Sequence, residues 1–119
     1  MKTLKFAPHL AQQVLAGEKT STWRLFDDKD LQEGDELVFL NKETNEAFGT
    51  AIVTSLHRKT LGSLEEVDWI GHERYPSEEE MYRTFRKYYG DWVKPDTGVK
   101  ILTFRFTAFE ITRKQNTDP

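Results

Sequence analysis

The sequence predicts an α+β domain, namely a small, mostly antiparallel β-barrel of about five to six strands that carries two to three helices. Short apolar segments with the alternating pattern of half-buried strands are the first observation, and two segments with helical spacing are the second. Turn residues separate these segments at short, irregular intervals, which does not fit a regular parallel βαβ array. Because the chain has 119 residues, we expect residues 1–119 to form a single domain with one core.

The first expected elements are a strand and a helix. Residues 3–6 have the composition of a short strand. Pro8 suits the first turn of a helix, and Leu10 and Val14 follow it at helical spacing. Gly17 can adopt the left-handed conformation that commonly follows a helix end, so we expect the helix to end just before it.

A β-hairpin is expected next. The apolar segments 36–40 and 47–56 flank a polar, turn-forming stretch, as the two strands of a hairpin do. The second segment has a composition typical of strands. We expect three of its side chains to face the core: Phe48, Ile52 and Leu56.

Two capping boxes predict helices in the middle of the chain. The first begins at Ser63 and predicts a short helix that continues through Ile70. The second begins at Ser77 and predicts a longer helix over residues 78–89, which Gly90 ends. The buried stripe of this longer helix is expected to consist of Met81, Phe85 and Tyr88.

The C-terminal part of the chain predicts one long strand and a tail. Apolar residues alternate with polar ones over residues 99–111, which indicates a strand that is bent along its length. One of its faces is expected to carry Leu102, Phe104, Phe106 and Ala108. Residues 112–119 lack this pattern, and we expect them to form a frayed tail.

Composition and charge exclude several classes of protein. A formal net charge of −3 argues against a nucleic-acid footprint over the whole surface, so any RNA site must be a local patch. The absence of cysteine excludes disulfides and thiolate metal sites. The histidines at positions 9, 57 and 72 lack metal-ligand spacing, so we expect neither a metal nor a cofactor. Without an apolar run long enough to span a membrane, we expect a cytoplasmic protein with no membrane partner.

The most informative stretch is the octet from Gly17 to Arg24, which reads Gly-Glu-Lys-Thr-Ser-Thr-Trp-Arg. It places two cations, Lys19 and Arg24, beside three hydroxyl groups. If the chain turns tightly at the glycine, Lys19, Thr22 and Arg24 can converge on an anion, a carbonyl or a developing oxyanion. The alternative is a basic turn that leads into an edge strand.

The octet resembles the G-x-K-x-x-T-x-R signature of the ASCH family, which belongs to the PUA-like superfamily of small β-barrels. The order of elements is also similar to that family. A Gly34-Asp35 turn precedes an apolar strand, an Ala-Ile-Val-Thr strand begins at Ala51, and a helix ends in residues 85–90. The resemblance covers residues 4–109 and implies a PUA-like barrel.

The resemblance implies two kinds of function. Many ASCH members are regarded as RNA-binding or RNA-processing modules. A smaller bacterial branch hydrolyses the amide of N(4)-acetylcytidine and related acylated cytosines, with a lysine, a threonine and a glutamate as the proposed catalytic set. Lys19 and Thr22 match the first two by position, and Glu73, shortly before the second long helix, is our match for the third.

An amidohydrolase would need an activated nucleophile. The Thr22 hydroxyl attacks only after a base has removed its proton. Lys19 can be that base if burial or a nearby cation such as Arg24 lowers its pKa toward neutrality. Glu73 could orient the lysine or carry a proton to the leaving amine. A nearby carboxylate also opposes the lowering of the lysine pKa, and the sequence leaves this balance open.

A binding module would use the same cleft to hold a nucleotide base or phosphate without chemistry. Aromatic rings can stack on the base, since single-stranded RNA is recognised by stacking and edge contacts. The alternative for these rings is core packing. The residues expected to bind the ligand are Arg24, Thr20, Ser21, Trp23, His72 and Tyr75.

Outside the cleft, a local basic patch would follow the phosphates of RNA. Its expected members are Arg58, Lys59, Arg83, Arg86 and Lys87, and the alternative is an ordinary solvated surface. A third interpretation of the chain is a ribonuclease in which Lys19 and Arg24 act with His57 or His72.

Overall fold

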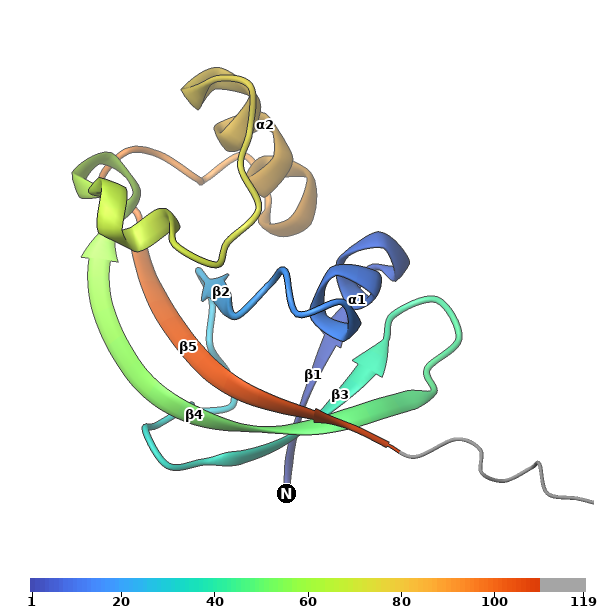
Figure 1. The fold of residues 1–119 in the computed structure, drawn as a ribbon. Helices are drawn as coiled ribbons and strands as arrows, with labels where there is room; N and C mark the ends of the chain where they lie inside the picture. Colours follow the sequence, from blue (N-terminus) through green and yellow to red (C-terminus); the bar gives the residue numbers. More distant parts are fainter. Residues whose placement is uncertain (110–119) are drawn as a thin grey trace, which may run out of the picture.

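The computed structural model describes residues 1–109, which form one five-stranded curled sheet, or half-barrel, with two α-helices (Figure 1). The strand order is β1-β3-β4-β5-β2; β1 and β3 are parallel and the other neighbours antiparallel. The strands are β1 (Lys2–Phe6), β2 (Ser21–Arg24), β3 (Glu36–Asn41), β4 (Ala47–Thr60) and β5 (Gly98–Ala108). This confirms the predicted α+β, mostly antiparallel fold. The expected tail, residues 112–119, lies outside the described residues.

The helices α1 (Pro8–Leu15) and α2 (Glu78–Tyr89) lie toward opposite ends of the sheet (Figure 1). Pro8 occupies the first turn of α1, and Gly17 follows that helix with a φ of +78°, as its sequence position predicted. The side chain of Ser77 accepts a hydrogen bond from the Glu80 backbone N–H, so α2 begins where its capping box predicted.

Two expectations for α2 and the preceding segment need correction. Tyr88 is 50% exposed rather than buried, although Met81 and Phe85 are buried as expected. The short helix predicted from Ser63 is replaced by two 3₁₀ turns, η1 (Leu61–Ser63) and η2 (Glu66–Trp69). The reason is that the Ser63 hydroxyl accepts from the Thr60 backbone N–H behind it instead of capping a helix ahead.

The hairpin of β3 and β4 forms as predicted, but its inward register differs. Ile52 is 36% exposed, whereas Ala51 and Val53 are buried in the core. Gly49 lies beneath the ring of Phe106 on the neighbouring strand, and a Cβ at Gly49 would overlap that ring. Since side chains alternate along a strand, this places Gly49, Ala51 and Val53 inside and Ile52 outside; the register shift between Val53 and Ser55 ends this alternation. Phe48 and Leu56 are partly buried against the core, as expected.

The buried side chains form two clusters rather than the single core expected. One lies between α1 and the β1–β3–β4 part of the sheet, and the other lies under α2. The long strands β4 and β5 curve together across the sheet (Figure 1), and β5 supplies buried residues to both clusters. Their pairing shifts register between Val53 and Ser55, which is the irregularity that a bend introduces. Within residues 1–109, no helix is both long and apolar enough to cross a membrane.

Candidate functional site

The two edges of the half-barrel face each other at the octet. β2 carries Ser21 to Arg24 and is one edge of the sheet, while β1 is the other edge. The Arg24 Nη2 donates a hydrogen bond across this seam to the backbone carbonyl of Lys5, at 3.3 Å. The guanidinium also lies over the ring of Phe6, with 5.6 Å from Cζ to the ring centroid. Arg24 therefore bridges two strands that are not paired with each other.

A loop distant in the sequence is tied to the octet by backbone hydrogen bonds. The carbonyl of Gly71 accepts from the backbone N–H of Thr20 at 2.9 Å and from that of Ser21 at 3.1 Å. Gly71 has a φ of +75°, a conformation that glycine adopts readily. A Cβ at this position would overlap the Thr20 hydroxyl. The following residues, His72 and Glu73, are thereby brought against the octet.

Lys19 and Glu73 form an ion pair behind the seam. The Lys19 side chain is 2% exposed, and its Nζ donates to the Glu73 carboxylate and, at 2.8 Å, to the Ser21 carbonyl. Burial lowers the pKa of Lys19, Glu73 opposes this shift, and Arg24 adds to it. Burial would raise the pKa of the Glu73 carboxyl, but attraction to His72 and Lys19 outweighs it and holds that pKa below its usual range.

His72 is a neutral, buried ring in this site. It stacks on Trp23 with ring centroids 3.9 Å apart and an angle of 17° between the planes. Burial, reinforced by the charge of Lys19, lowers the pKa of His72 to about 4. Its Nδ1 lies 2.8 Å from the backbone carbonyl of Glu73; because a carbonyl can only accept, Nδ1 carries the proton of the neutral ring. At neutral pH the charge that keeps Glu73 ionised therefore comes from Lys19.

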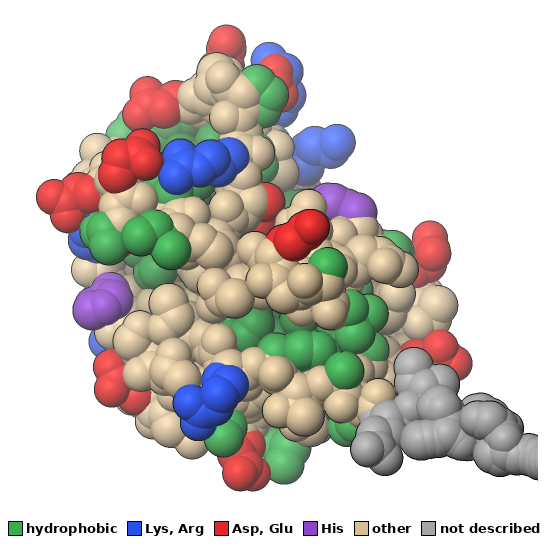
Figure 2. Space-filling model, viewed as in Figure 1, with side chains coloured by type: hydrophobic (Ala, Val, Ile, Leu, Met, Phe, Trp, Pro, Cys, Tyr) green, Lys and Arg blue, Asp and Glu red, His purple; other side chains and the backbone are tan. Residues whose placement is uncertain are grey.

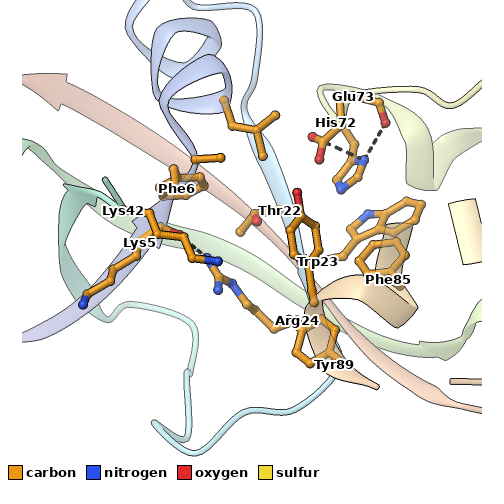
Figure 3. A pocket seen from close by; sticks show the side chains of 13 residues that line it. Lys5, Phe6, Thr22, Trp23, Arg24, Lys42, His72, Glu73, Phe85 and Tyr89 are labelled. Carbon is orange, nitrogen blue, oxygen red and sulfur yellow. Dashed lines mark hydrogen bonds and ion pairs between the residues drawn. The ribbon is translucent and has the colours of Figure 1, made fainter. Parts of the chain in front are cut away.

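A pocket of about 220 Å³ opens at the seam, between α2 and the β1 edge (Figure 3). From the predicted site, Thr22, Trp23, Arg24, His72 and Glu73 line it. Its remaining walls come from β1, α1 and the ends of β3 and α2: Lys5, Phe6, Ala7, Leu10, Lys42, Phe85, Tyr88 and Tyr89. Lys19 does not line this pocket but supports it from behind through Glu73.

The other predicted ligand-binding residues lie elsewhere. Thr20 is exposed, and Ser21 is buried with its hydroxyl unpaired among the described residues. Both line a hollow on another part of the surface, together with His57. Tyr75 packs among Trp69, His72 and Phe85 instead of lining the seam pocket; burial and the Glu73 carboxylate raise its pKa.

Trp23 is too well packed to stack on a bound base. Its side chain is 3% exposed and packs against His72, Trp69 and Phe85. It therefore has little free ring surface to offer a base. The rings with exposed area at the pocket are those near the end of α2, where Tyr88 is half exposed.

The residues of the expected basic patch line two different hollows. Arg58 and Lys59 line one beside β5, and Arg83, Arg86 and Lys87 line another with Glu79 and Asp91. Lys59 is paired with Glu65 and Asp68, and Arg83 with Glu80. On the face shown in Figure 2, acidic and basic side chains are interspersed. These pairs reduce the positive charge that the patch could offer to phosphates.

Several residues that line the pocket were missed by sequence reasoning. Lys5 and Lys42 are exposed residues at strand ends, and a single exposed lysine carries no local signal. Tyr88 and Tyr89 had a usable signal, because two adjacent tyrosines before a helix-ending glycine cannot both face the core. Among residues 1–109, no three His, Asp or Glu side chains gather closely enough to hold a metal ion.

Comparison with known proteins identifies the fold. No family model matches the sequence, and no curated protein matches it. A structure from Enterococcus faecalis, described as DUF984, superposes with a TM-score of 0.77 at 16% identity, over 91% of this chain and 77% of that one. An ASCH domain from Lactobacillus crispatus gives 0.63 at 17% identity, over 83% and 70% of the two chains. An ASCH protein from Zymomonas mobilis gives 0.63 at 12% identity, over 87% and 65%. The chain thus has the fold of ASCH domains.

Proposed function

We propose that the protein binds a nucleoside, free or within RNA, with its base in the seam pocket. The observation that carries this proposal is the convergence of Thr22, Arg24 and Glu73 on one pocket with aromatic walls. A base edge combines amine donors with carbonyl and ring-nitrogen acceptors. A carboxylate held ionised by Lys19 can accept from an amine, and an arginine and a hydroxyl can donate to acceptors.

The size of the pocket supports a base rather than a larger group. Its volume of about 220 Å³ lies below the range of about 300–1,000 Å³ that is typical of pockets for drug-sized ligands. That space suits one flat heterocycle, so the sugar would lie at the mouth of the pocket. Tyr88 and Tyr89 offer ring surfaces at the pocket, and base–aromatic stacking contributes about 1–3 kcal/mol.

Isothermal titration calorimetry with the four ribonucleosides and N(4)-acetylcytidine tests the proposal. We expect at least one to bind, and Arg24→Gln to weaken that binding by about tenfold or more, because a hydrogen bond from a charged group is lost. Arg83→Gln is the matched control, since Arg83 lies on the exposed face of α2 and pairs with Glu80 rather than with a residue of the pocket. Absence of binding at millimolar concentration, or equal weakening by both variants, would contradict the proposal.

The second candidate function is hydrolysis of an N(4)-acylated cytidine. It is favoured by the lowered pKa of Lys19 together with its contact to Glu73, a carboxylate that shares the pocket with Thr22. The Lys19 ammonium would first pass a proton to the Glu73 carboxylate, to which it is hydrogen-bonded. Thr22 Oγ would then attack the acyl carbonyl as the neutral Lys19 amine takes its proton, and the C–N bond would break. Glu73 would carry the proton to the leaving cytidine amine, and water would then hydrolyse the acyl-threonine ester to release the carboxylic acid.

Chromatographic detection of cytidine released from N(4)-acetylcytidine tests this reaction. The wild type should release it, Thr22→Val should not, and Thr22→Ser should retain part of the rate because it keeps the hydroxyl. Thr54→Val is a control, since Thr54 is an exposed strand hydroxyl outside the pocket. If high concentrations of the wild type release no cytidine, hydrolysis is excluded and nucleoside binding is still testable by titration.

A further inference from the structure

The charges of the seam pocket are separated. Figure 3 shows Lys5 and Lys42 on one side of the pocket and His72 and Glu73 on the other, with Arg24 between them along the lower wall. The carboxylate side is already balanced, because Lys19 pairs with Glu73 from behind. Asp27 and Glu73 attract the Arg24 guanidinium, but no carboxylate in the part of the chain that the structure describes forms an ion pair with a cation on this side.

The three cations on this side have unused hydrogen-bonding capacity. Arg24 Nε is buried and has no hydrogen-bond partner among residues 1–109, and its Nη2 reaches only a backbone carbonyl. Lys42 Nζ lies 5.4 Å from the centroid of the Tyr88 ring, at the mouth of the pocket. Neither Lys5 nor Lys42 forms an ion pair within the described residues. A partly buried guanidinium without an anion is costly, so an incoming anion would be stabilised here.

Three other cations on strands of the sheet have partners: Lys2, Lys59 and Lys100 each reach a carboxylate oxygen within 2.9 Å. Arg58 and Arg105, which are exposed, form no ion pair within the described residues. The unpaired cations at the seam are therefore not explained by a general lack of acidic neighbours in the fold. They surround the mouth of the pocket, where the sugar of a bound nucleoside would lie.

We propose that Arg24, Lys5 and Lys42 form a phosphate subsite, so that the preferred ligand is a nucleotide rather than an uncharged nucleoside. This inference rests on the proposed function, because the base in the pocket positions the phosphate at its mouth. Arg24 offers planar, directional N–H donors, and the two lysines offer mobile point charges. A phosphate monoester of a free nucleotide and a phosphodiester of RNA share this chemistry.

Calorimetric titration at low salt tests the subsite with matched pairs of probes: each ribonucleoside and its 5′-monophosphate. We expect the monophosphate of the bound base to bind about 10- to 100-fold more tightly than its nucleoside, because it adds at least one charged contact. Lys42→Gln should remove much of this difference. Lys94→Gln, a control at an exposed loop position away from the pocket, should preserve the difference.

The outcomes separate this inference from the proposed function. Equal affinity for nucleoside and monophosphate, or equal effects of Lys42→Gln and Lys94→Gln, would overturn the subsite and leave nucleoside binding intact. Failure of every nucleoside and nucleotide to bind would overturn both. Titration with a dinucleoside monophosphate, which contains a phosphodiester, distinguishes an RNA backbone phosphate from the monoester of a free nucleotide. If the diester gains as much affinity as the monoester, the subsite takes an RNA backbone phosphate; if it gains none, the subsite takes the monoester.

Discussion

Lys19 donates a hydrogen bond to the carboxylate of Glu73, although the two residues are 54 positions apart in the chain. The lysine side chain is 2% exposed and the glutamate side chain 19%, so the pair is largely withdrawn from water. Such a pair contributes little net stability when intact, but removing one partner leaves a buried charge without compensation. Replacing either residue alone should therefore destabilise the fold, even though Glu73 also lines the pocket.

The first prediction concerns this pair. Glu73→Gln should lower the free energy of unfolding at pH 7 by about 3 kcal/mol, measured by urea denaturation, because the Lys19 ammonium loses its counter-charge. Adding Lys19→Met to that variant should cost less than the sum of the two single substitutions, since the double variant has no unpaired charge. Glu18→Gln, at the exposed neighbouring position, should change stability by less than about 0.5 kcal/mol. Strict additivity in this cycle would argue against a coupled pair.

The second prediction concerns the backbone contact that holds the His72–Glu73 loop. Gly71→Ala should destabilise the protein by roughly 2–3 kcal/mol, because the residue has a positive φ and its new Cβ meets the Thr20 hydroxyl. Gly17→Ala is the control: its φ is also positive, but the space around it is open, so we expect a loss of only about 1–2 kcal/mol.

Combining Gly71→Ala with Thr20→Ala separates the two causes of this loss. Removal of the hydroxyl should return the cost to the level of Gly17→Ala, as thermal or urea unfolding would measure. If the double variant is as unstable as Gly71→Ala alone, the overlap with Thr20 is not the source of the loss.

The third prediction follows from the pKa of His72, which burial and Lys19 lower from 6.5 to about 4. As the pH falls, His72 takes up a proton in the unfolded chain before it does so in the folded protein. The contribution of His72 to the free energy of unfolding is therefore fully present above pH 6.5, decreases between pH 6.5 and pH 4, and is constant below pH 4. The full loss is about 3 kcal/mol. Protonation of Glu73, whose pKa is lowered below 4.5, acts at a lower pH than most of this window.

Urea denaturation between pH 7 and pH 4.5 measures this effect. His72→Phe, which retains a flat ring against Trp23, should have a weaker pH dependence than the wild type over that range, whatever its absolute stability. His9→Gln, a change at an exposed position on α1, should keep the slope of the wild type. Identical slopes for His72→Phe and the wild type would show that another group causes the acid sensitivity.

The fourth prediction compares a partly buried ion pair with an exposed one. Lys100 on β5 and Asp27 in the loop after β2 are 2.6 Å apart, with side chains 14% and 8% exposed. Burial would raise the pKa of Asp27, but its hydrogen bond from Lys100 and its backbone hydrogen bonds lower it overall. Lys100→Met should cost about 2 kcal/mol, because a partly buried carboxylate loses its charged hydrogen-bond partner and keeps only its backbone donors. Arg83→Met, which breaks an exposed pair on α2, should cost less than about 0.5 kcal/mol. Similar losses in urea denaturation would contradict this difference.

Elements controlled by local interactions were predicted well. The bounds of α2 followed from Ser77 at its start and Gly90 at its end, because a capping hydrogen bond and a positive φ involve only neighbouring residues. The same kind of prediction was wrong at Ser63. Its hydroxyl could accept from a backbone N–H after it or before it in the chain, and it accepts from that of Thr60. The inward register of β4 could not be deduced either, since it depends on Phe106 of another strand lying over Gly49.

By itself the sequence determined the α+β class, the positions of the two α-helices and the long strands, and the chemical groups of the octet, because alternation, caps and residue types are local properties of the chain. Only the tertiary structure decided which of these groups share a pocket. The backbone hydrogen bonds of the Gly71 carbonyl bring Glu73 to Lys19. Thr22 and Arg24 line the same pocket as Lys42 because the two edges of the sheet face each other. Burial lowers the pKa values of Lys19 and His72. These outcomes depend on contacts between residues far apart in the chain, and burial is a property of the packed neighbours rather than of the residue itself.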